Sequence, residues 1–191
     1  MAVSSFATQG SGTNRNAAEL ARLAYRAMAA SFFPTPPHLI PSFRVWHCPA
    51  AGPHTSWVIF QPRSDDPVGA TPIARRLVWD RDRDLERIEL GGRLRPKVEP
   101  SVVATESGLD GEILSRLMDE AGRLSLPRHR LARPCLMEQV AEFGLEGFDR
   151  ELREGARPVV RIEWDKNPPL QLEAMAGWAD RVRQWLRQTM P

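Results

Sequence analysis

The side chains best suited to bind a metal ion are His47, Cys48 and His54, which lie close together around one loop. Imidazole nitrogens and a thiolate are ligands that zinc prefers, but a structural site closes with about four ligands. A fourth would have to come from a distant part of the chain. In a strand, His47 and Cys48 would also point to opposite faces. We therefore expect no metal or other cofactor, and a buried cysteine beside a surface histidine.

The thiol groups of Cys48 and Cys135 could also serve as catalytic nucleophiles. A reactive cysteine needs a base within hydrogen-bond reach, and a cation or a helix N-terminus that lowers its pKa. Arg133 precedes Cys135, but Pro134 and Leu136 give no helix start. No Gly-x-Ser-x-Gly elbow is present either. We assign no catalytic residue, and an enzyme whose site is assembled only in the fold is our third hypothesis.

Alternating aspartates at Asp80, Asp82 and Asp84 resemble the opening of a calcium-binding loop. Such a loop needs glycine where this chain has Leu85, and a bidentate glutamate where it has Gly91. Arginines also stand between the aspartates and neutralise them. The run therefore predicts a solvated, salt-bridged turn and no calcium site.

Arginines and one histidine form the best candidate binding surface, provided that the fold brings them together. This basic strip would combine Arg128, His129, Arg130 and Arg133 with Arg75, Arg76, Arg93 and Arg95. Phosphate groups of a nucleic acid would suit it, as would acidic side chains of a protein partner. The net charge is only +2, with 26 basic and 24 acidic residues, which favours the protein partner.

Tryptophan is unusually frequent, with six copies against a single tyrosine. Most of the tryptophans fall in predicted strands, where large aromatic rings pack a sheet against helices. Trp178 and Trp185 are separated by two helical turns and share one face of the last predicted helix. We expect both to be core residues, with an interface anchor as the alternative for one of them.

The elements that must position these residues follow from hydrophobic periodicity. Helical spacing covers 17–33, 110–126 and 172–188, and proline-rich sequence follows the first helix. Strand-like runs cover 43–46, 56–60, 74–79, 98–105, 136–143, 151–153 and 159–164, with Gly144 and Gly147 marking turns. Pro100 in the fourth run indicates an edge position or a late start. This order predicts an α+β fold. An antiparallel meander of five to seven strands carries two helices on one face, and an extra helix lies at the N-terminus.

Composition indicates an ordinary folded protein, with 42% hydrophobic and 26% charged residues in 191. We divide it into a flexible tail (1–16), an N-terminal helix with a proline-rich linker (17–41) and a single α+β domain (42–191). No signal peptide or membrane-spanning run is recognisable, and the two cysteines are far apart. These features predict a cytoplasmic protein, and its general pattern resembles small bacterial proteins whose sheet precedes a tryptophan-containing helix.

Our leading hypothesis is therefore a non-catalytic protein-binding or adaptor module. It would bind another protein, or a second copy of itself, through its sheet or its proline-tethered N-terminal segment. The alternative is a nucleic-acid-associated protein that uses the basic strip.

Overall fold

A computed structural model describes residues 10–28, 35–63, 70–90, 99–124, 141–148 and 158–190. The elements in chain order are α1 (Gly10–Met28), β1 (Leu39–His47), β2 (His54–Pro62), β3 (Ile73–Trp79), α2 (Arg81–Leu90), β4 (Val102–Gly108), α3 (Gly111–Gly122), β5 (Phe143–Phe148), β6 (Pro158–Trp164), the 3-10 turn η2 (Leu170–Leu172) and α4 (Glu173–Thr189). The predicted α+β class, the antiparallel sheet and the N-terminal helix are confirmed.

The six strands form one antiparallel sheet in the order β4-β3-β2-β1-β5-β6. The first four strands make a meander, since each pairs with its neighbour in the chain. The chain then crosses to the other side of β1, where β5 pairs with β1 and β6 with β5. Consequently β4 and β6 are the outer strands of the sheet.

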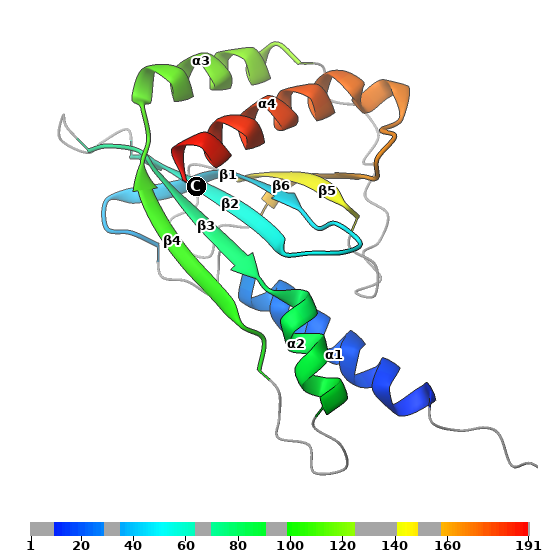
Figure 1. Ribbon diagram of the computed structural model, residues 1–191. Helices are drawn as coiled ribbons and strands as arrows, with labels where there is room; N and C mark the ends of the chain where they lie inside the picture. Colours follow the sequence, from blue (N-terminus) through cyan, green and yellow to red (C-terminus); the bar gives the residue numbers. More distant parts are fainter. Residues whose placement is uncertain are drawn as a thin grey trace, which may run out of the picture.

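Helices α3 and α4 lie side by side over one face of the sheet (Figure 1). Alternate strand residues such as Val45, Trp57 and Ile59 point to this face and are buried beneath the helices. The carboxylate of Asp110 caps α3 by accepting hydrogen bonds from the N–H groups of Glu112 and Ile113. These two helices and the sheet enclose the main core.

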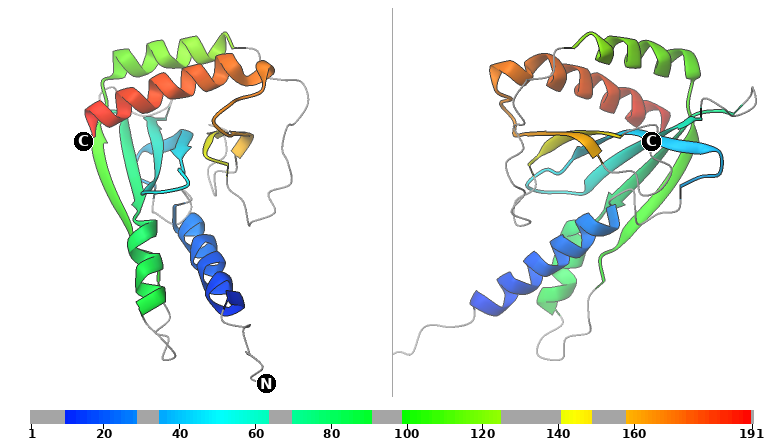
Figure 2. Two further views of the ribbon diagram at one scale, coloured as in Figure 1. Left: turned by 45° about the vertical axis from the view of Figure 1, so that its right-hand side comes forward. Right: turned by 180° about the vertical axis from the view of Figure 1, so that it is seen from behind.

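Helices α1 and α2 lie on the opposite side and extend away from the end of the sheet where β3 stops and β4 starts (Figure 2). Leu20 and Ala24 of α1 pack against Leu77 and Trp79 of β3, in a second, smaller cluster. Leu85 of α2 joins the same cluster. The α1 helix begins at Gly10, seven residues before its predicted start at Ala17.

The predicted solvated turn over the aspartate run is wrong, because this run is the helix α2. Its Asp84 is fully buried and accepts hydrogen bonds from Trp79 Nε1 at 2.9 Å and from the Ser101 N–H and hydroxyl at 2.6 and 2.7 Å. One carboxylate thus joins the end of β3, the helix α2 and the start of β4. The local sequence pattern could not show that Asp84 has these hydrogen-bond partners.

The prediction of turns at Gly144 and Gly147 is also wrong, since both glycines lie inside β5. At Gly144 the space is filled by the indole of Trp46 from the neighbouring strand. A strand glycine allows such close approach of an aromatic ring. The strands predicted over 151–153 and over most of 136–143 lie outside the described residues.

Candidate functional site

The outer side of β4 is an accessible row of ordered backbone groups at one end of the sheet. No strand in the described ranges pairs with that side. Val103 is 60% exposed, one of two large hydrophobic side chains exposed to this degree among the described residues. Ala104, Thr105 and Glu106 are exposed as well. Side chains on both faces of this strand are therefore open to solvent.

The pairing of β4 with β3 shows which backbone groups of β4 point outward. Leu109 N–H donates to Pro72 C=O at 2.8 Å, so this pair is in the hydrogen-bonded position of the antiparallel ladder. Such pairs recur at every second residue, which places the N–H groups of Val103 and Thr105 toward β3. The N–H and C=O groups of Ala104 and Glu106 then point away from the sheet.

The edge formed by β4 lacks the features that usually block strand addition. Charged side chains, proline and bulges are the common means of protecting a sheet edge. β4 has no proline, lysine or arginine, and it pairs with β3 without a register shift. Its one charged residue, Glu106, is bound by Arg75, whose Nε donates to Glu106 Oε1 at 2.6 Å.

The opposite edge, β6, differs in each of these respects. It starts at Pro158, and the pairing between β5 and β6 is irregular at Gly147 and Phe148. It also carries Arg161 and Glu163 on one face. The two edges of the same sheet are therefore chemically unequal: β4 pairs regularly with its neighbour and carries no proline or basic residue, whereas β6 has a proline, an arginine and an irregular pairing.

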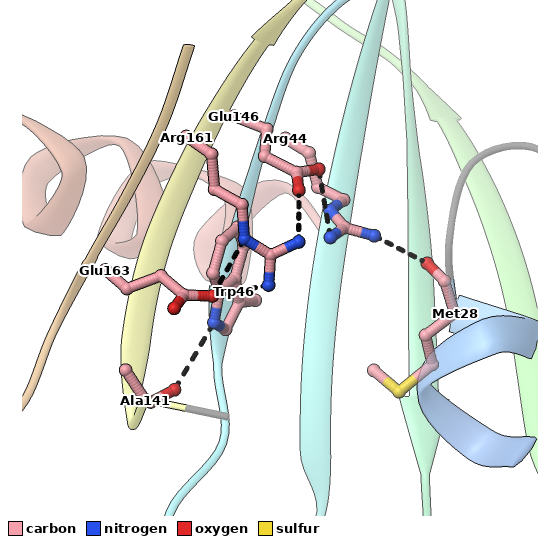
Figure 3. A network of polar contacts seen from close by, with 7 residues as sticks. All are labelled: Met28, Arg44, Trp46, Ala141, Glu146, Arg161 and Glu163. Atoms are coloured by element: carbon pink, nitrogen blue, oxygen red, sulfur yellow. Dashed lines mark hydrogen bonds and ion pairs between the residues drawn. The ribbon is translucent and has the colours of Figure 1, made fainter. Parts of the chain in front are cut away.

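A cluster of charged side chains lies on the face of β1, β5 and β6 that points away from α3 and α4 (Figure 3). Glu146 accepts from Arg44 on one side and from Arg161 on the other, each at 2.9 Å. Arg161 also binds Glu163. Both guanidinium groups lie over the ring of Trp46, at 5.1 and 5.4 Å from its centroid.

This cluster is charge-balanced and serves to join elements. Burial lowers the pKa of the Arg44 guanidinium, and the Glu146 carboxylate opposes that shift. Arg44 Nη1 also donates to the C=O of Met28 at 3.3 Å, at the end of α1. Two arginines and two glutamates that bind one another leave no excess charge for an ionic ligand. We therefore interpret the cluster as a structural tie between α1 and the sheet.

His54 and Cys48 are both held in forms that oppose metal binding and nucleophilic attack. His54 Nδ1 shares a hydrogen bond with Tyr25 Oη, and its Nε2 shares one with Pro49 C=O, each at 3.1 Å. Burial lowers the pKa of His54 to about 4. Burial raises the pKa of the Cys48 thiol to about 12. Both His54 nitrogens are thus occupied, and the thiol stays protonated at neutral pH.

The structure does not bring Arg75 and Arg76 together on one surface. Being adjacent in β3, they project to opposite faces of the sheet. Arg75 is buried, with its guanidinium 5.0 Å from the centre of the Phe60 ring and bound to Glu106. Arg76 donates to Met190 C=O at 3.2 Å, near the end of α4. The other members of the basic strip, Arg128, His129, Arg130, Arg133, Arg93 and Arg95, lie outside the described residues.

The two tryptophans of α4 are parts of the main core. Trp178 is buried, and its Nε1 donates to Leu117 C=O of α3 at 2.8 Å. Trp185 is half-buried and packs against the same core. Pro100 in the strand predicted over 98–105 indicated an edge position or a late start, and β4 indeed starts at Val102 and is an outer strand. The sequence did not single out its outer side as a binding site.

Two further observations concern the described ranges. No group of three or more His, Cys, Asp and Glu side chains there is placed to hold a metal ion. None of the helices in those ranges is long and apolar enough to cross a bilayer.

The chain matches no protein family model, no curated protein and no solved structure.

Proposed function

We propose that this protein is a non-catalytic protein-binding module that accepts an extended segment of another polypeptide as an additional strand beside β4. The observation that carries the proposal is the outward direction of the Ala104 and Glu106 backbone groups on an exposed, regular edge. In this mode of recognition, main-chain hydrogen bonds supply affinity and alternate side chains supply specificity.

The position of this edge is fixed before any partner arrives. Asp84 ties the start of β4, through Ser101, to Trp79 at the end of β3. The far end of β4 leads directly to Asp110, the cap of α3. A preorganised edge lowers the entropic cost of binding, because the accepting strand need not be ordered in the complex.

The polar side chains of the interior support binding over catalysis. Asp84, Glu146 and His54 are all engaged in hydrogen bonds or ion pairs that join helices to the sheet. A general acid or base needs to reach a substrate from a cleft. We place the protein in the cytoplasm, since a buried Cys48 thiol with a raised pKa suits a reducing compartment.

The test is selection of a random displayed-peptide library on the purified protein. Selected peptides should bind the wild type, retain binding to the Ala104→Thr variant, which keeps its N–H, and lose binding to the Ala104→Pro variant. Proline at 104 removes one outward N–H and leaves the ladder with β3 intact, because the Ala104 N–H does not donate to β3. Peptides that bind the proline variant equally well would overturn the proposal, as would a selection without enrichment.

A further inference from the structure

The chemistry around β4 also indicates which segment would fit there. We infer that the partner strand runs antiparallel to β4 and carries a basic residue opposite Glu106, an apolar residue opposite Ala104 and a β-branched residue opposite Val103. This inference rests on the proposed strand addition and specifies its ligand. From its N-terminus to its C-terminus, the partner strand would carry a basic residue, any residue, an apolar residue and a β-branched residue.

The basic position follows from the state of the Glu106 carboxylate. Arg75 Nε and Nη2 both contact the same oxygen, Oε1, of Glu106. The other oxygen, Oε2, has no partner within the described ranges, and the side chain is 46% exposed. A lysine or arginine on an added strand would be the direct cross-strand neighbour of this carboxylate. The exposed oxygen Oε2 can therefore accept a hydrogen bond from a basic side chain on an added strand.

The apolar positions follow from Val103 and Ala104. On an antiparallel partner, the residue opposite Val103 forms a non-hydrogen-bonded pair, in which side chains approach most closely. A β-branched side chain there would cover Val103, which is otherwise exposed to water. On the other face Ala104 is small and exposed, which leaves room for a larger apolar side chain.

The inner neighbour of β4 already shows this pattern. In β3, Arg75 lies opposite Glu106, Leu77 opposite Ala104 and Val78 opposite Val103. Strands on the two sides of β4 meet the same row of side chains, so a partner that repeats the β3 pattern would place the same residue types beside Glu106, Ala104 and Val103. The antiparallel direction also agrees with all five pairings of the sheet.

The test uses two fluorescein-labelled nine-residue peptides, one with a central Lys-Thr-Val-Val and one with norleucine in place of the lysine. Their dissociation constants would be measured by fluorescence anisotropy against the wild type and the Glu106→Gln, Ala104→Thr and Ala104→Pro variants. We expect the lysine peptide to bind the wild type about two- to fivefold tighter than Glu106→Gln, a typical range for one cross-strand charge pair. The norleucine peptide should not distinguish these two proteins.

The outcomes separate this inference from the proposed function. If both peptides lose binding to Ala104→Pro but neither responds to Glu106→Gln, strand addition is supported and the basic position is wrong. If neither peptide binds the wild type while the displayed library yields peptides sensitive to Ala104→Pro, the whole side-chain pattern is wrong and strand addition still holds. The Ala104→Thr variant retains its N–H, so it should keep measurable binding of both peptides and bind them more tightly than Ala104→Pro does.

Discussion

The indole of Trp46 rests directly on Gly144 of the neighbouring strand: a β-carbon built on Gly144 would lie 1.9 Å from Cζ2 of the ring. That separation is far below van der Waals contact, so a side chain cannot enter without moving the ring. The ring is itself held by its Nε1 hydrogen bond to Ala141 C=O and by Arg44 and Arg161. The close fit of this pair therefore adds to the backbone pairing that joins β1 and β5.

Replacing Gly144 with alanine should destabilise the protein by about 2 kcal/mol, because the added methyl group overpacks the space beneath Trp46. Urea denaturation followed by tryptophan fluorescence measures this loss. Gly147→Ala is the matched control in the same strand, since a β-carbon there meets only Val160 Cβ at an ordinary 3.9 Å. Equal stability of the two variants would contradict the packing argument.

Stability should fall as the pH is lowered from about 6.5 to about 4, because of His54. Burial depresses its pKa from 6.5 to about 4 in the folded protein. The unfolded chain therefore binds a proton in this window while the folded chain does not. The resulting loss is roughly 2 kcal/mol after allowance for solvent screening. Urea midpoints at pH 7 and pH 5 measure it.

The control for this pH dependence is His54→Gln, which cannot take up the proton. The pKa of His47 is also lowered, by burial and by Arg183 and Arg187, so some dependence should remain in that variant. A pH dependence unchanged by His54→Gln would show that His54 is not its main source.

Tyr25→Phe should lower stability at pH 7, since it removes the hydrogen bond to His54.

Replacing Asp84 with asparagine should cost about 3 kcal/mol, because the carboxylate accepts three hydrogen bonds in a fully buried position. The asparagine amide would place a donor among these donors. Thermal unfolding measures the effect, and Glu86→Gln on the exposed side of the same helix is the control. A loss no larger than that of the control would show that Asp84 does not anchor α2.

Amide hydrogen exchange should alternate along β4. The N–H groups of Val103 and Thr105 point toward β3 and should exchange slowly, whereas those of Ala104 and Glu106 should exchange rapidly. The matching proline substitutions should differ as well. Thr105→Pro removes a ladder hydrogen bond and should cost about 2 kcal/mol, and Ala104→Pro removes none. Uniform protection along the strand would contradict this assignment.

Periodicity in the sequence was sufficient to predict most of the sheet and three of the helices, but it missed β5. Strands at 43–46, 56–60, 74–79 and 159–164 all lie within observed strands, because alternating or continuous apolar runs reflect burial on a sheet. Helix α2 was missed because its apolar face is short and its charges dominate the pattern. Its burial of Asp84 depends on Trp79 and Ser101, which local sequence does not reveal.

The candidate site was harder to predict than the fold. A strand over 98–105 was expected, and Pro100 indicated an edge position or a late start, but nothing in Val103-Ala104-Thr105 shows which backbone groups point away from the sheet. Its position at the edge results from β5 pairing with β1 on the far side of the sheet, a contact between distant segments. The many arginines favoured a basic binding strip, but Arg75 and Arg76 point to opposite faces of the sheet.

The inequality of the two sheet edges sets the stoichiometry of any complex made at β4. A protein whose two sheet edges are both unprotected can pair with copies of itself edge to edge and grow into fibres. Here Pro158 and the irregular pairing at Gly147 mark the β6 edge as a poor donor or acceptor of strands. Association should therefore terminate after one segment has bound, giving discrete one-to-one complexes that do not polymerise.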